Sequence, residues 1–300
     1  MKDKTAVDVM LLGHFSKDRL VIDDEVEICP GGSIYYGSIP LRHLGLSVAV
    51  VTRLHPDDFP FLDELREEGV QVFGRPAPAT SSVANIYRSA DMERRICKLQ
   101  SFAGPFQKAD LPDLTAQIYL VVPIIAGEVD LELLQWVAQR GPVGLDVQGF
   151  VRVPQQGELV FQPWPDMAEG LARVTYLKVD RAEAELLTGK SDLRAAAREL
   201  AAYGPREVLV TQSSGVTVYA EGKLYTAPFT PRSLAGRTGR GDTCFAAYVG
   251  QRLSVSPEEA TRTAAAITTL KQEKPGPWRG ALDDVAALLA DERRTPRYVV

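Results

Sequence analysis

The sequence has little cysteine. Its three cysteines, Cys29, Cys97 and Cys244, stand far apart in a chain of 300 residues. An odd number of widely separated cysteines matches neither a disulfide framework nor the paired spacing of a structural zinc site. This pattern favours a reducing compartment, and we expect the protein to be cytoplasmic.

The sequence also lacks an excess of positive charge and long apolar runs. Its formal net charge is −5, whereas binding to a nucleic-acid backbone or an anionic membrane needs a basic surface. No apolar run approaches the roughly 20 residues that span a bilayer. Residues 1–8 are polar and charged, unlike a secretory signal. We therefore expect neither nucleic acid nor a membrane as a partner.

Several common catalytic signatures are absent. There is no G-x-G-x-x-G fingerprint, so nothing directly supports a dinucleotide oxidoreductase. Residues 188–191 imitate the end of a P-loop, but Ala184 stands where the first glycine is required. We interpret Gly189 as a helix C-cap instead. Neither metal-ligand spacing nor a hydrolytic triad is found around the three histidines, which are His14, His43 and His55.

Hydrophobic residues make up 45% of the chain, enough for a sizeable core. Short apolar runs typical of buried strands alternate with segments of helical spacing. The expected strands are 7–12, 47–52, 70–73, 118–125, 143–147, 176–179 and 207–211. The expected helices are 31–44, 56–68, 131–139, 192–202, 242–253 and 257–270. This alternation predicts a parallel sheet covered by helices on both faces.

Two stretches break the alternation. Residues 18–28 and 83–99 alternate apolar with polar side chains and are predicted to be exposed strands. One interpretation is a small lid sheet against one edge of the main domain. The alternative is a pair of surface hairpins without a role.

Residues 236–243 form the most informative segment. Gly239 and Gly241 allow unusual backbone angles and close approach to a ligand. Asp242 is expected to open a helix, whose free N–H groups form an anion site. A carboxylate beside an anion site suits phosphoryl transfer, because it accepts a proton from the attacking hydroxyl. The alternative is a simple N-cap aspartate after a glycine turn.

This segment resembles the C-terminal signature of the ribokinase-like (pfkB) carbohydrate kinases, D-T-x-G-A-G-D-(T/S)-F. The positions that match are Thr238, Gly239, Gly241, Asp242 and Thr243. The resemblance implies a kinase with Asp242 as general base and residues 239–242 as the anion hole.

Three positions depart from that signature. Gly236 replaces an aspartate that often helps to order a monovalent-cation site, so a potassium requirement is left open. Arg237 replaces threonine, and Arg240 replaces alanine. Arg240 either contacts phosphate with its fork of donors or points to solvent.

The resemblance covers nearly the whole chain. Residues 29–33 resemble the family's N-terminal P-G-G segment, in which Gly31, Gly32 and Ser33 face the substrate. The expected asparagine of that segment is Gly37 here. Asp18 matches an aspartate that binds sugar hydroxyls. The implied fold is a single three-layer α/β/α sandwich over residues 1–300, with a mainly parallel central sheet and a β lid from about 15–30 and 82–103.

The resemblance also implies ATP and magnesium as cofactors. Residues 180–189 resemble an N-x-x-E segment with its E-L-L-T-G tail, whose glutamate, Glu183, acts near magnesium through water. Residues 208–215 resemble the strand and T-x-G-x-x-G segment that binds nucleotide. The expected nucleotide-binding residues are Lys178, Asp180, Thr211, Gly215, Thr238 and Gly276.

The acceptor is expected to be a sugar or a cyclic polyol. Residues 146–153 resemble the D-x-Q-x-x-x-R segment of plant-type myo-inositol kinases, so myo-inositol is the first candidate and Gln148 a substrate ligand. Asn85 on the lid is a further expected ligand. Alternatives are a nucleoside kinase of the same superfamily and a non-catalytic sugar-binding or regulatory protein. Exposed lid strands can also pair across a homodimer, and the oligomeric state is left open.

Overall fold

The computed structural model describes residues 6–23, 25–88, 91–291 and 298–299. A ten-stranded sheet runs through the molecule in the order β16-β15-β14-β13-β12-β9-β8-β1-β4-β5. Its parallel strands are β1 (Ala6–Leu12), β4 (Val48–Leu54), β5 (Gln71–Pro76), β8 (Thr115–Val121), β9 (Val143–Asp146), β12 (Tyr176–Asp180) and β13 (Glu207–Gln212). Antiparallel pairing adds β14 (Gly215–Ala220), β15 (Lys223–Pro228) and β16 (Tyr298–Val299).

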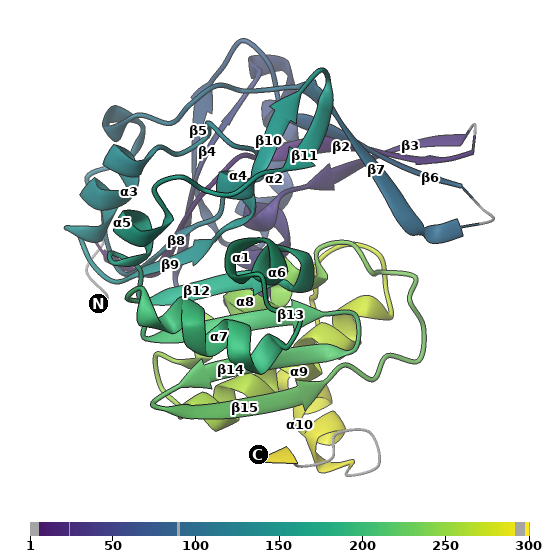
Figure 1. Cartoon of the computed structure of the whole chain (residues 1–300). Helices are drawn as coiled ribbons and strands as arrows, with labels where there is room; N and C mark the ends of the chain where they lie inside the picture. Colours follow the sequence, from purple (N-terminus) through teal and green to yellow (C-terminus); the bar gives the residue numbers. More distant parts are fainter. Residues whose placement is uncertain (1–5, 24, 89–90, 292–297, 300) are drawn as a thin grey trace.

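Helices cover both faces of this sheet (Figure 1). Val9 and Leu11 of β1 face one core, and Met10 and Leu12 face the other, as the two-residue period of a strand requires. The first core is closed by α1 (Ser33–His43), α2 (Asp63–Glu67), α8 (Arg240–Gln251), α9 (Pro257–Gln272) and α10 (Leu282–Ala290). The second is closed by α3 (Leu131–Ala138), α5 (Met167–Leu171), α6 (Arg181–Thr188) and α7 (Leu193–Ala202). The predicted three-layer sandwich is confirmed.

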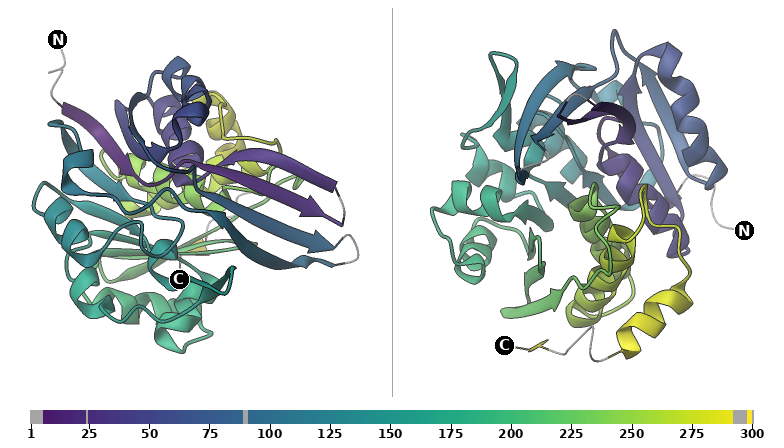
Figure 2. Two further views of the ribbon diagram at one scale, coloured as in Figure 1. Left: turned by 90° about the horizontal axis from the view of Figure 1, so that it is seen from above. Right: turned by 90° about the vertical axis from the view of Figure 1, so that its right-hand side faces the viewer.

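A second, six-stranded sheet extends from one side of the main body (Figures 1 and 2). It contains the two predicted lid segments as β2 (Ser16–Ile22), β3 (Glu25–Gly31), β6 (Ser82–Arg88) and β7 (Asp91–Ser101). The hairpin β10 (Arg152–Gln155) and β11 (Glu158–Phe161) completes it. Residues 24, 89 and 90 of the predicted lid lie outside the described residues. The division of the chain into one domain with a lid stays a prediction.

The second sheet exposes large apolar side chains to solvent. Val26, Ile28 and Ile96 are each more than half exposed. An exposed apolar face on a sheet with free edges is compatible with pairing between copies of the chain. The homodimer through the lid stays a prediction.

Several expected elements differ in the structure. The helix expected at 56–68 is a 3-10 helix, Pro56–Leu62, followed by α2, because Pro60 lies within it. The strand expected at 118–125 ends at Val121. The antiparallel strands β10, β11, β14 and β15 and the helix α10 were not predicted from the sequence. Gly189 is confirmed as a helix C-cap, with φ 68° at the end of α6.

Candidate active site

Polar residues gather where the parallel strands end. Asp146 ends β9, Asp180 ends β12, and Thr211 is the next-to-last residue of β13. The N-termini of α1 and α8 approach this edge, since Ser33 of α1 bonds to Asp242 of α8. The carboxyl edge of such a sheet is where α/β proteins bind ligands.

Helix α8 begins earlier than the sequence indicated. Gly239 is its N-cap with φ 77°, so Arg240 is the first helical residue and Asp242 the third. The expectation that Asp242 opens the helix is therefore wrong by two residues. The N-cap alternative for Asp242 is also excluded. Instead, its Oδ1 accepts a hydrogen bond of 2.5 Å from the Ser33 hydroxyl.

The loop before α8 is packed tightly against α1. A Cβ on Gly239 would lie 2.1 Å from Cγ of Tyr36, so no other residue fits there without rearrangement. Thr243 Oγ1 donates to the carbonyl of Tyr36 at 3.0 Å. Gly37 also faces α8, where an added Cβ would stand 3.1 Å from that of Ala246. This close approach of two helices accounts for glycine at position 37 instead of the expected asparagine.

A buried charge cluster lies beneath the loop. The Lys178 ammonium is 3.1 Å from Asp146 and 3.6 Å from Glu183, and all three side chains are at most 5% exposed. A Cβ on Gly241 would lie 3.6 Å from Lys178 Nζ and 3.8 Å from Thr211 Oγ1. The structure therefore brings Lys178, Thr211 and Gly241 together, and it adds Asp146, which was not among the predicted site residues.

The pKa values within this cluster reflect burial and mutual charge. Burial raises the pKa of Glu183 to about 7, with Lys178 opposing the rise. Burial also raises the pKa of Asp146, and the positive charge of Lys178 again opposes the rise. For Lys178, burial lowers the pKa, but Asp146 and Glu183 outweigh it and raise the value. Lys178 therefore remains an ammonium at neutral pH.

Asp180 and Glu183 form a capping box at the start of α6. The Asp180 side chain accepts from the Glu183 N–H at 2.9 Å, and Glu183 Oε2 accepts from the Asp180 N–H at 2.6 Å. Glu183 is fully buried, and its Oε1 has no hydrogen-bond partner among the described residues. One carboxylate oxygen therefore remains for a ligand.

On the acceptor side, the structure brings Asp18 next to Gly31. Asp18 Oδ1 accepts from the Val83 N–H at 3.1 Å, and a Cβ on Gly31 would lie 2.7 Å from Asp18 Oδ2. Gly32 has φ 89° as the N-cap of α1, and its Cβ position lies 2.4 Å from the carbonyl oxygen of His14. Gly32 is thus required by its positive φ and by close backbone contact, whereas a side chain at Gly31 would displace the side chains of Ser16 and Asp18.

The other two predicted acceptor ligands lie on different elements. Asn85 is in β6, where it pairs with Cys97 of β7, whose thiol is 3.5 Å from Asn85 Oδ1. Gln148 begins the short helix α4 (Gln148–Val151), and its amide donates to the carbonyl of Ile124 at 3.4 Å.

The remaining predicted nucleotide residues lie on loops and a hairpin. Gly215 begins β14, and a Cβ there would be 2.5 Å from the carbonyl oxygen of Ala227, so strand packing alone requires this glycine. Thr238 is exposed in the loop before α8. Gly276 has φ 78° in the loop after α9.

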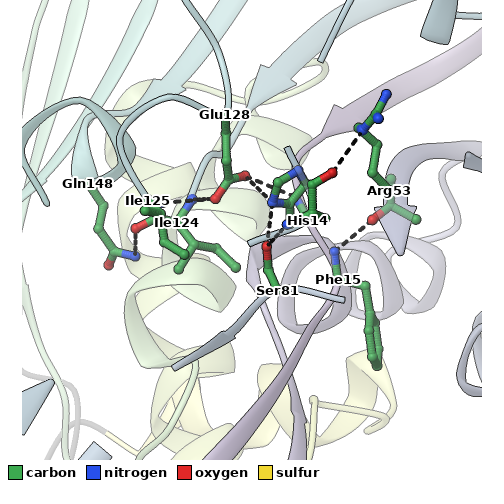
Figure 3. A network of polar contacts seen from close by, with 10 residues as sticks. His14, Phe15, Arg53, Ser81, Ile124, Ile125, Glu128 and Gln148 are labelled. Carbon is green, nitrogen blue, oxygen red and sulfur yellow. Dashed lines mark hydrogen bonds and ion pairs between the residues drawn. The ribbon is translucent and has the colours of Figure 1, made fainter. Parts of the chain in front are cut away.

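Beneath the acceptor side lies a buried polar network (Figure 3). Glu128 accepts from the N–H groups of Ile124 and Ile125, both at 2.8 Å, and of His14 at 3.2 Å. The His14 ring bonds to the Ser81 hydroxyl at 2.8 Å. Burial raises the pKa of Glu128 to about 8, although the hydrogen bonds from these N–H groups favour the charged form and oppose the rise. Burial lowers the pKa of His14 to about 3. Glu128 was not predicted because isolated acids after a strand carry no motif.

We expect Glu128→Gln to lower the free energy of unfolding by about 1–3 kcal/mol. The amide oxygen can still accept from Ile124 and Ile125, but the new NH₂ group then faces the N–H of His14, donor to donor. Urea unfolding is measured at pH 5, where its raised pKa keeps Glu128 protonated and as uncharged as glutamine, so that only the lost acceptor for the His14 N–H is compared. Glu132→Gln, at a side chain 77% exposed, is the control and should stay within about 0.5 kcal/mol of the natural protein. Equal stability of both variants would contradict this role for Glu128.

The family model for the pfkB family of carbohydrate kinases matches residues 8–281. The chain belongs to this family. It is a sugar or polyol kinase of the ribokinase superfamily, a phosphotransferase with a hydroxyl acceptor. None of the helices in the described parts of this kinase is both long and apolar enough to cross a membrane.

Three of the proteins to which the chain is similar match nearly its whole length. A pyrophosphate-dependent kinase of the ribokinase family, solved with a pyrophosphate analog and myo-inositol, is 37% identical with a TM-score of 0.86, covering 93% of this chain and 99% of that one. A pyrophosphate-dependent myo-inositol-1 kinase, converted by mutation into a myo-inositol-3 kinase, is 36% identical with a TM-score of 0.86. The match covers 95% of this chain and 99% of that one. A cytidine kinase of Thermococcus kodakarensis is 25% identical over 285 residues, 91% of this chain and 98% of the relative.

Proposed function

We propose that this kinase transfers a phosphoryl group to a hydroxyl of a cyclic polyol, with myo-inositol as the first candidate. The observation that carries the proposal is the pairing of Asp242 with Ser33 at the meeting point of two helix N-termini. Asp242 accepts the proton of the attacking hydroxyl. The N–H groups of residues 239–242 stabilise the transferring phosphoryl group.

The acceptor is proposed to lie between the second sheet and the N-terminus of α1. Asp18, Gly31, Gly32 and Ser33 already meet there, close to the general base. We assign Asn85 and Gln148 to the outer hydroxyls of the acceptor. The relatives crystallised or engineered as myo-inositol kinases support a ring of several hydroxyls as the ligand.

For the donor we propose inorganic pyrophosphate in place of the ATP expected from the sequence. Two of the relatives above are described as pyrophosphate-dependent. In this chain the loop before α8 also packs directly on the end of α9, where the family resemblance places adenine. The Gly236 N–H donates to the Gln272 carbonyl at 2.8 Å, and a Cβ on Gly236 would lie 1.7 Å from the Lys274 carbonyl oxygen. Main-chain contact of this kind favours a donor without a base.

Cationic groups at the loop favour a highly charged donor. Arg240 is half-buried at the first position of α8, and its Nε has no hydrogen-bond partner among the described residues. Burial lowers the pKa of Arg240. A pyrophosphate oxygen would supply both the missing acceptor and the opposite charge. The matrix of donors and acceptors described below tests pyrophosphate against the ATP that the sequence predicts.

Magnesium is kept as a proposed cofactor that neutralises charge on the donor. Glu183 Oε1, buried and unpartnered among the described residues, offers one oxygen to a metal-bound water. Lys178, 3.6 Å from the other oxygen, disfavours direct binding of a divalent ion there. No group of three or more metal-ligating side chains is found within the described part of the chain.

A matrix of donors and acceptors tests these assignments. Pyrophosphate, ATP and CTP are each combined with myo-inositol, ribose, fructose 6-phosphate, adenosine and cytidine, with and without magnesium. We expect the phosphorylated product, detected by phosphorus NMR, with pyrophosphate and myo-inositol. Turnover with ATP alone would overturn the donor assignment and leave the acceptor assignment standing.

A nucleoside kinase is the second candidate, because the Thermococcus relative is a cytidine kinase. In the same matrix it predicts phosphorylation of cytidine or adenosine and none of the polyol. Binding of myo-inositol with no transfer from any donor would instead support a non-catalytic sugar-binding protein.

A further inference from the structure

Lys271 is a buried ammonium that none of the assignments above uses. It lies in the last turn of α9 and is only 2% exposed. Its Nζ donates to the carbonyl of Gly236, at the start of the loop that leads to Asp242. Among the described residues it forms no ion pair with a carboxylate. A charge buried in this way is costly unless its surroundings compensate for it.

The compensation comes from a carbonyl oxygen and an aromatic face. Nζ lies 4.9 Å from the centroid of the Tyr36 ring, which is a cation–π contact. The same ring packs against Gly239, whose Cβ position lies 2.1 Å from its Cγ atom. Lys271 therefore supports the loop at its start directly and at its end through Tyr36.

The charge of Lys271 also acts on the proposed base. Burial lowers the pKa of Lys271 to about 8, and the Asp242 carboxylate opposes this shift. The two groups thus attract one another although no direct contact joins them. A fixed positive charge at this place favours both the Asp242 carboxylate and an incoming phosphate.

We propose that Lys271 is a positioning residue that acts as a tethered monovalent cation for the loop 236–242. The Lys271 ammonium supplies the single positive charge of a bound monovalent cation, and one carbonyl oxygen and a ring face hold it there in place of a shell of oxygen ligands. Because this charge belongs to a side chain of the protein, no ion has to bind. The lysine holds the N–H groups of residues 239–242 where they meet the phosphoryl oxygens. The proposal rests on the proposed phosphoryl site at this loop, and it implies that the natural enzyme needs no added monovalent cation.

The first test uses the natural protein, with pyrophosphate, myo-inositol and magnesium. Turnover should be the same in potassium, ammonium and tetramethylammonium chloride at equal ionic strength. A requirement for potassium or ammonium would overturn the proposal, because the tethered charge would then not be sufficient. ATP and ribose are run alongside, so that a wrong donor or acceptor is recognised as a failure of the proposed function.

The second test removes the charge. Lys271→Ala should lower kcat by about 10²-fold with little change in the KM for myo-inositol, since misplaced groups cost about that much. Ammonium or methylammonium ions should restore part of this loss in Lys271→Ala. Lys271→Met, which fills the space without charge, should not respond. Lys223→Met, at an exposed lysine that begins β15 and has no role in the proposed site, is the control and should keep natural kinetics.

A third measurement does not depend on turnover. Hydrogen exchange of the amides in 236–243 should be about tenfold faster in Lys271→Met than in the natural protein, because the loop loses its anchor. Amides of α7, remote from the loop, should be unchanged, which also establishes that the variant is folded. Unchanged exchange in 236–243 would overturn the positioning role whatever reaction the enzyme catalyses.

Discussion

Replacing Asp242 by asparagine is expected to lower kcat by about 10²- to 10⁴-fold, the usual cost of losing a general base. Asparagine keeps an oxygen that can accept the 2.5 Å bond from Ser33, so the local geometry is retained. It has no basic oxygen to take the proton of the attacking hydroxyl. Steady-state kinetics with the donor and acceptor found in the matrix measure the effect.

The stability of Asp242→Asn should change little. A negative charge in the first turn of a helix is worth about 0.3–1 kcal/mol, and only this amount is lost. Asp130→Asn is the matched control, because Asp130 caps α3 away from the site and asparagine caps equally well. A kcat for Asp242→Asn above about a tenth of the natural value would exclude Asp242 as the base.

Replacing Lys178 by methionine is expected to lower the free energy of unfolding by about 3–5 kcal/mol, because removing one partner leaves buried carboxylates uncompensated. Asp146 and Glu183 both lose the ammonium that holds them, and neither is accessible to water. Urea unfolding at pH 8 measures the loss. A second substitution, Asp146→Asn, should recover part of the lost free energy of unfolding, because it removes one of the two buried carboxylates left without Lys178.

The deficit of Lys178→Met should depend on pH. The pKa of Glu183 is already raised to about 7 by burial against the opposing effect of Lys178, and loss of Lys178 raises it further. A carboxyl with a raised pKa in the folded state contributes stability below its unfolded pKa, and this contribution is lost as the pH rises through the folded value. The variant should therefore be closest to the natural protein near pH 5 and furthest from it at pH 8.

Lys190→Met provides the control for Lys178→Met. Lys190 pairs with Glu199 at the surface, where its side chain is 44% exposed. Exposed pairs contribute only about 0–1 kcal/mol. A similar loss in both variants, or a deficit for Lys178→Met that does not vary with pH, would contradict the charge cluster as the cause.

Much of the fold could be predicted because its strands and helices have clear periods. The buried parallel strands are apolar runs, and α7, α8 and α9 have regular apolar spacing. The hairpin β10–β11 was missed because each of its strands has only four residues and Pro154 interrupts the first of them. The hairpin β14–β15 was missed because it follows the parallel strands without an intervening helix.

The sequence by itself determined the alternation of the buried parallel strands with helices and the glycine loop that leads to Asp242, because both depend on residues close together in the chain. Tertiary structure alone decided which distant groups meet there. Ser33 pairs with Asp242 across 209 positions, and Lys271 reaches Gly236 from the end of α9. Asp146 joins Lys178 because β9 and β12 are adjacent in the sheet. Such contacts have no local signature, since each partner alone is an ordinary polar residue and only packing in three dimensions buries it beside the other.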